Sequence, residues 1–328
     1  MYNINNTTEN KKKSKPPKNK PVKLDQILKL LFKVSNRTLV NTINGLFNEN
    51  FEPDDITVSV SKTATEFIKD SLDVLRADMF LKVVKADKRR HFHIEYQLNP
   101  ANTMGIRVFE YGILKALELL REGDNADDII LPKAVVIHFE ESGTIPDQYV
   151  KGVIFPNGTR NEYTVDVIKY WTLSDKALVK KKLYNLLPLQ LFTLRAELDK
   201  ITSAETKITM GKKVSKKIAN IVEDLYQQNE INSDDHDKII TGLAELVKHV
   251  DERYELNQKL SGVNEMIKTL NIARKAEKKG EQKKAVETAK KMLLKNRPID
   301  EIVEFTGLTE KKITDIQKIL EKAGNKKN

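Results

Sequence analysis

Two acidic residues in the first third of the chain have the type and spacing to bind a divalent cation. Asp78 and Glu95 each lie in a segment where apolar and polar residues alternate, as neighbouring β-strands do. Carboxylate oxygens are ligands that Mg²⁺ prefers, and bound Mg²⁺ retains several waters. Because a metal-bound water can attack a phosphodiester, the pair indicates hydrolysis with Mg²⁺, or alternatively Mn²⁺, as cofactor.

The alternation predicts which side chains share a face with these acids. Successive strand residues point to opposite faces. Residues 91–98 (HFHIEYQL) therefore place Glu95 and Gln97 on one face with both histidines, and an apolar row on the other. In residues 75–84, Asp78 shares its face with Arg76, opposite a second apolar row. Both strands are expected to turn a mainly polar row the same way.

The connection between the two strands sets how close the acids come. A symmetric six-residue connection over residues 85–90 would place Asp78 opposite Gln97 and Phe80 opposite Glu95. The acids would then be diagonal neighbours, with Cβ atoms roughly 5–8 Å apart. Exposed acids also occur on any solvated sheet face, so alternation alone leaves a structural role open. His93 could assist a metal or be an ordinary surface residue.

The elements around this hairpin indicate an α/β core followed by helices. Apolar spacing predicts helices over 24–47, interrupted near residues 35–36, and over 102–121. Further strands are expected at 56–60, 134–139, and in a hairpin of 149–155 and 162–168 around Pro156-Asn157-Gly158. After about residue 174 only helical patterns remain, at 178–198, 214–228, 234–260, 274–291 and 299–320. This order favours an α/β domain with an α-helical appendage.

The ordered motifs resemble the PD-(D/E)XK nuclease superfamily and, more closely, the bacterial Rpn family of recombination-promoting nucleases, also called PD-(D/E)XK family transposases. The resemblance covers roughly residues 24 to 200. Its landmarks are Asp25-Gln-Ile-Leu-Lys29, Arg76-Ala-Asp78, Ile94-Glu-Tyr-Gln97, Met104-Gly-Ile-Arg-Val-Phe-Glu-Tyr111, Leu131-Pro-Lys-Ala-Val-Val-Ile-His138 and Leu186-Leu-Pro-Leu-Gln190.

This resemblance implies a restriction-endonuclease-like core with a mixed central sheet and an active site of Asp78, Glu95 and Gln97. Asp78 and Glu95 would bind the metal. Gln97 replaces the superfamily's usual lysine; it can orient a water but carries no charge to offset a developing anion. Arg76 or Arg107 could supply that charge to a phosphate, or could form a structural ion pair.

Two further residues of the resembled motifs have alternative roles. Asp25 is either a third acid near the site or a charge favoured at a helix N-terminus. Tyr111 could stack on a base or pack its helix against the sheet. Composition and pattern divide the chain into a disordered basic arm (1–22), a core (23–173), a helical region (174–270) and a basic connector with a helical hairpin (271–328), and the resemblance implies that the core is nuclease-like.

Charge and composition fit a nucleic-acid partner without requiring one. The net charge is +10, and seven lysines lie in residues 11–23 with no acid among them. Such an arm could contact phosphates or simply solubilise the chain. The chain has no cysteine, no apolar run long enough for a membrane span and no signal-like N-terminus, so a cytoplasmic protein is expected.

The sequence therefore predicts a Mg²⁺-dependent DNA endonuclease linked to recombination or transposition. A catalytically weak or inactive nucleic-acid-binding protein with the same fold is the alternative, and a helical interaction module is a third. The last segment, around Thr306-Gly307-Leu308, has helix-turn-helix spacing. It could contact DNA or form a homo-oligomer through the C-terminal helices.

Overall fold

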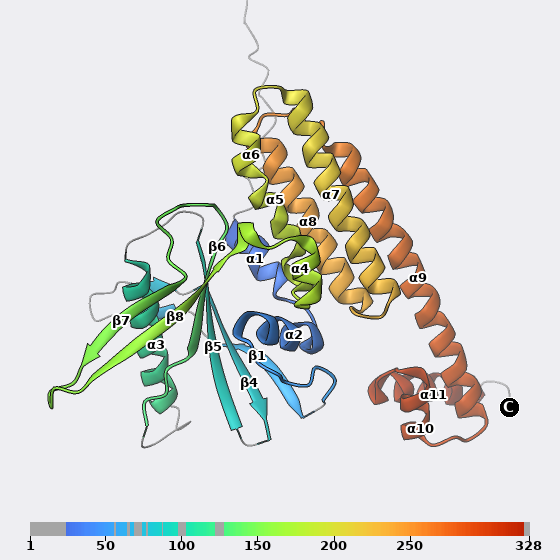
Figure 1. The fold of residues 1–328 in the computed structure, drawn as a ribbon. Helices are drawn as coiled ribbons and strands as arrows, with labels where there is room; N and C mark the ends of the chain where they lie inside the picture. The colour runs from blue at the N-terminus through green and yellow to red at the C-terminus, as the bar shows by residue number, and fades with distance from the viewer. Residues whose placement is uncertain are drawn as a thin grey trace, which may run out of the picture.

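The computed structural model describes residues 24–55, 57–63, 66–68, 74–76, 78–86, 88–97, 103–121 and 128–324. The expected basic arm, residues 1–22, lies outside this part of the chain. The described part combines one large mixed β-sheet with many helices, so the predicted α/β class is confirmed (Figure 1).

The six-stranded sheet has the order β1-β4-β5-β6-β8-β7. Strands β5, β6 and β8 are parallel, and the other neighbours are antiparallel. The strands are β1 (Val58–Thr63), β4 (Met79–Lys85), β5 (Lys88–Gln97), β6 (Lys133–His138), β7 (Gln148–Ile154) and β8 (Arg160–Lys169). The predicted hairpin at Pro156-Asn157-Gly158 is confirmed, with Gly158 at φ +82°, where a β-carbon would be strained.

The hairpin that carries Asp78 and Glu95 differs from the prediction in two ways. Its connection is shorter, because Lys85 already pairs with Lys88. Its first strand is also shorter: β3 (Val74–Arg76) pairs with β2 (Glu66–Ile68) in a separate two-stranded sheet, and β4 begins at Met79. The prediction of a six-residue loop was wrong because its lysines and arginines lie at the exposed ends of the two strands, where charged side chains are tolerated.

Helices cover both faces of the large sheet (Figure 1). Helix α3 (Met104–Arg121) packs on one face, where Val108 clusters with Val136 of β6 and Val165 of β8. Helices α1 (Leu24–Leu31) and α2 (Asn36–Phe47) contribute to the larger core on the other face, together with Leu81 and Ile94. The predicted break near residues 35–36 is confirmed, since Ser35 caps α2 by accepting from the Thr38 backbone N–H.

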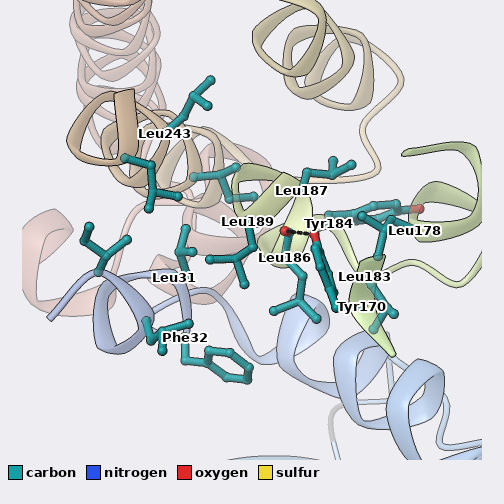
Figure 2. Close-up of a cluster of buried hydrophobic side chains, with 14 of the residues drawn as sticks. Leu31, Phe32, Tyr170, Leu178, Leu183, Tyr184, Leu186, Leu187, Leu189 and Leu243 are labelled. Carbon is teal, nitrogen blue, oxygen red and sulfur yellow. Dashed lines mark hydrogen bonds between the residues drawn. The ribbon is translucent and has the colours of Figure 1, made fainter. Parts of the chain in front are cut away.

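The helical region packs on the α2 side of the sheet and shares its core. Figure 2 shows Leu31 of α1 and Leu243 of α8 (Ser233–Arg253) near leucines of η2 (Tyr184–Leu189), while the Tyr170 hydroxyl donates to the Leu186 carbonyl at 2.7 Å. Apolar packing is therefore continuous across residues 173 and 174. The elements are η1 (Tyr170–Thr172), α4 (Asp175–Lys180), η2 (Tyr184–Leu189), α5 (Gln190–Thr193), α6 (Arg195–Lys200), α7 (Ala204–Gln227), α8 (Ser233–Arg253) and α9 (Ser261–Leu294).

The C-terminal helices form a small cluster of their own. Helices α10 (Ile299–Thr306) and α11 (Glu310–Gly324) pack against the end of α9 around Ile302 and Ile313 (Figure 1). Gly307 ends α10 with φ +65°, as a helix C-terminal glycine commonly does. The predicted pair of short helices is thus confirmed. Within the described residues, no helix has the length and apolarity needed to span a membrane.

Candidate active site

Asp78 and Glu95 lie beside each other, and each carboxylate accepts a backbone N–H from the opposite strand segment. The Asp78 N–H donates to Glu95 Oε1 at 3.1 Å, and the Tyr96 N–H donates to Asp78 Oδ2 at 2.7 Å. The β4–β5 register pairs Met79 with Ile94, so its continuation by one residue sets Asp78 opposite Glu95. The expected diagonal arrangement was therefore wrong; the two acids are direct cross-strand neighbours.

The predicted facing of the two strands is confirmed. Met79 and Leu81 of β4, with Phe92 and Ile94 of β5, lie in the large core. The intervening residues point toward α3, because the side-chain period of a strand is two. Glu95 consequently lies between the sheet and α3, and its side chain is fully buried.

Three neighbours surround the buried Glu95 carboxylate. In addition to the Asp78 N–H, Oε1 lies 2.9 Å from His93 Nε2, and Oε2 accepts from Arg107 Nη2 at 3.0 Å. A buried charge is tolerated only when it is paired and hydrogen-bonded, and Arg107 supplies both. The ion-pair alternative for Arg107 is thus the one present in this geometry.

His93 is held by rings on two sides. Its imidazole stacks on Phe80 of β4 with centroids 4.3 Å apart, and it meets the edge of Tyr111 of α3 at 5.8 Å. Its Nδ1 is buried without a partner among the described residues. Because Nε2 points at Glu95 Oε1, this ring fixes the orientation of the carboxylate.

Arg107 and Tyr111 come to the site from adjacent turns of α3. The Arg107 side chain is 39% exposed, and its guanidinium carbon lies 5.8 Å from the Tyr111 ring centroid. Tyr111 is 4% exposed and clusters with Phe80, so it packs the helix onto the sheet. Burial raises the pKa of Tyr111; Arg107 opposes this rise, and the Glu95 and Asp78 carboxylates add to it.

A second set of polar side chains follows at the carboxyl ends of β5 and β6. Gln97 pairs in register with His138, so the two share the α3 face. His138 Nε2 lies 3.0 Å from the Tyr149 hydroxyl, and burial lowers the pKa of His138 to about 4. Sequence reasoning missed His138. The available signal was a histidine ending an apolar strand next to the strand that bears Gln97.

The remaining expected site residues are placed only in part. Arg76 ends β3, in the separate two-stranded sheet, and Asp25 lies in the first turn of α1; both side chains fall outside the described part. His91 lies two residues before His93 on the same face. Its pKa is lowered to about 4, first by burial and then by the Lys82, Lys115 and Arg89 charges.

The oxygen ligands available at this site for a hard divalent cation are few. Asp78 and Glu95 supply two carboxylates, and Gln97 on the same face adds an amide oxygen. Mg²⁺ is commonly bound by one or two carboxylates and several waters. No group of three or more His, Cys, Asp or Glu suited to a metal occurs among the described residues. A cation here would thus be held by two acids, one of which, Glu95, is already paired with Arg107.

Comparison with known proteins adds no family to this geometry. Neither the family models, nor the curated proteins, nor the solved structures contain a match to this chain.

Proposed function

We propose that this chain is a metal-dependent endonuclease that hydrolyses DNA phosphodiester bonds, built on a restriction-endonuclease-like core. The observation that carries the proposal is the position of Asp78 opposite Glu95, where the Asp78 N–H donates to Glu95 Oε1 and the Tyr96 N–H donates to Asp78 Oδ2. The ordered motifs of residues 24–200, which resemble the Rpn family, also support it. A role in recombination or transposition follows from that resemblance.

Asp78 and Glu95 would hold Mg²⁺, or Mn²⁺, which supplies an activated water and neutralises charge on the phosphate when bound. Gln97 lies next along the same face of β5 and orients a water or a phosphate oxygen through its amide. His93 keeps the Glu95 carboxylate in a single orientation.

Arg107 has the role of a phosphate ligand in this proposal. Its guanidinium pairs with Glu95 Oε2, yet more than a third of the side chain is exposed. With Asp78 and Glu95 holding the metal, Arg107 would be available to donate to a phosphate oxygen, for which its planar donors are suited. Arg107 would then supply the positive charge that Gln97 lacks.

A noncatalytic nucleic-acid-binding protein is the second candidate, and one observation favours it. Each Glu95 oxygen already has a protein donor, Asp78 N–H on one side and Arg107 on the other. A carboxylate satisfied in this manner gains less from a cation than a free one does. The basic N-terminal arm would serve either function.

Nicking of supercoiled plasmid separates the two candidates. Wild-type protein should nick DNA with Mg²⁺ and not with EDTA, and Asp78→Asn and Glu95→Gln should each lower the rate by at least about a hundredfold. Glu162→Gln and Asp166→Asn, exposed acids on β8 of the same sheet, are matched controls and should retain the rate. Circular dichroism verifies that each variant is folded. Equal nicking by wild type and Asp78→Asn would refute the enzyme; a folded wild type that binds DNA without nicking it would support the second candidate.

A further inference from the structure

A pocket on the α2 side of the sheet combines lysines with a buried, unpartnered amide. Its volume is about 490 Å³, and it lies between α2 and the segment that follows α4. Lys180, Lys181 and Lys182 line one side, and asparagines of α2 line the other. Since α3 and the candidate active site occupy the opposite face of the sheet, this pocket is separate from them.

The polar side of the pocket is a single stripe of α2. Asn41, Asn44, Gly45 and Asn48 follow the i, i+3, i+4, i+7 spacing of one helix face. Gly45 brings the lysines close, because a β-carbon there would collide with the Lys181 carbonyl oxygen. The loop after α4 can therefore lie directly on the helix.

Two of the asparagines have structural partners, and one does not. Asn44 exchanges hydrogen bonds with both backbone groups of Phe51, at 2.7 and 3.0 Å. Asn48 is the left-handed residue that ends α2. Asn41 is only 3% exposed, and its Nδ2 has no hydrogen-bond partner within the described chain. An unsatisfied buried amide is unfavourable, so a ligand that accepts a hydrogen bond from it would be stabilised there.

The charge of the pocket selects an anion. All three lysines are exposed, and Lys182 has a distant acidic partner in Glu230, at 3.7 Å. Glu52 is the acid on the pocket's rim. Three exposed lysines, one of them paired with Glu230, outnumber the single lining carboxylate, and the buried Asn41 amide adds an unpartnered donor at the wall, a combination that suits a phosphate group. The volume leaves room for an attached sugar.

We infer that this pocket binds a phosphate group, held by Lys180, Lys181 and Lys182 and by the Asn41 amide. The phosphate can come from a nucleic-acid backbone or from a free nucleotide, since both present the same oxygens. This inference does not depend on hydrolysis at Asp78 and Glu95, and a protein without nuclease activity would retain it.

Calorimetric titration with thymidine 5′-monophosphate, at constant ionic strength in chloride, tests the pocket. Full-length wild type should bind one equivalent, and Lys180→Gln/Lys181→Gln should weaken binding by about tenfold or more. Lys212→Gln/Lys213→Gln, two exposed lysines of α7 with the same change in charge, should stay within about twofold. Asn41→Leu should weaken binding without altering net charge. Asp78→Asn should bind as wild type does, which separates this inference from the proposed function.

Three results would overturn the inference, and the first two concern binding by wild type and by the α7 control. One is the absence of nucleotide binding by wild type, and the other is an equal loss in the α7 control variant. Lysines that only stabilise the C-terminal end of α4 would lower the melting temperature and leave nucleotide affinity unchanged, which also contradicts it. Competition with a short DNA duplex identifies the source of the phosphate. Displacement of the nucleotide by the duplex would show that the pocket binds a nucleic-acid backbone phosphate, and unchanged nucleotide binding would show that it binds a free nucleotide.

Discussion

The chemistry proposed for this chain depends on how a few side chains hold one another. Asp78 and Glu95 are joined by backbone contacts across β4 and β5, and Arg107 pairs with the buried Glu95 carboxylate. The facing of Glu95 could be predicted because side chains alternate along a strand. Its pairing with Arg107 could not, because it depends on how α3 docks on the sheet.

His138 illustrates what sequence periodicity cannot reveal. It ends the run Ala-Val-Val-Ile-His, whose apolar residues predict a core strand, and its side chain is indeed fully buried. Only the parallel pairing of β5 with β6 brings it level with Gln97. Parallel neighbours far apart in sequence leave no local signature, so this contact had to come from the structure.

Burial of His138 predicts a loss of stability in mild acid. The pKa of His138 is lowered to about 4, whereas an unfolded histidine titrates near 6.5. Below pH 6.5 the unfolded state therefore binds more protons, and the stability present above that pH is lost as the pH falls toward 4. The loss from His138 between pH 7.5 and 5.0 should reach about 2 kcal/mol.

Urea unfolding of wild type and His138→Gln at pH 7.5 and pH 5.0 measures this effect. Glutamine can still reach the Tyr149 hydroxyl but does not titrate, so the variant should lose less stability at pH 5.0. The pKa of His91 is also lowered to about 4, but His91 is present in both proteins and contributes equally to both. Identical pH dependence in the two proteins would show that His138 titrates normally when folded.

At the level of elements, the hairpin turn determines the geometry of the acids. Lys85 pairs with Lys88, so the connection is much tighter than the polar run from residue 85 to residue 90 suggests. The prediction of strands succeeded because alternation is a local signal, and the register failed because charged residues occur in loops and at exposed strand ends alike. Because the turn is shorter, Asp78 lies opposite Glu95 and not opposite Gln97, so the two acids are directly opposed and not diagonal.

Ala86 occupies the left-handed region in this turn, with φ +51°. That conformation costs a non-glycine residue about 1–2 kcal/mol. Glycine avoids this cost, but it loses more backbone entropy on folding, which offsets part of the gain. Ala86→Gly should therefore stabilise the protein by about 0.5–1 kcal/mol in urea unfolding. Ala196→Gly, at an exposed helical position in α6, should instead destabilise it by about 0.5–1 kcal/mol. Destabilisation by both changes would contradict the backbone geometry of this turn.

On the scale of the whole molecule, a buried acid joins the helical region to the start of the fold. Asp235 of α8 is fully buried and accepts from the Ser35 N–H at 2.5 Å, the Ser35 hydroxyl at 2.5 Å and the Thr38 hydroxyl at 2.7 Å. The sequence shows the helices but not this contact between residues about 200 positions apart. Long-range docking is specified by shape and partners, which periodicity does not encode.

Asp235→Ala should lower the free energy of unfolding by about 3 kcal/mol or more, because three donors lose a charged acceptor. Asp234→Ala, which removes an exposed neighbour paired with Lys238, should cost about 1 kcal/mol or less. Fluorescence of the single tryptophan, Trp171, and hydrogen exchange in α8 should report the same loss, since the apolar core is continuous between them. A loss confined to α8 would indicate that the helical region unfolds independently.

Binding of Mn²⁺, followed by electron paramagnetic resonance, tests most directly whether Asp78 and Glu95 share a cation. Wild type should bind one Mn²⁺ that Mg²⁺ displaces, and Asp78→Asn and Glu95→Gln should each abolish that site. Arg107→Gln should bind Mn²⁺ more tightly than wild type, because it removes the cation that competes for Glu95 Oε2. Mn²⁺ binding of equal strength in wild type, Asp78→Asn and Glu95→Gln, or no binding by folded wild type, would contradict a metal site between these strands.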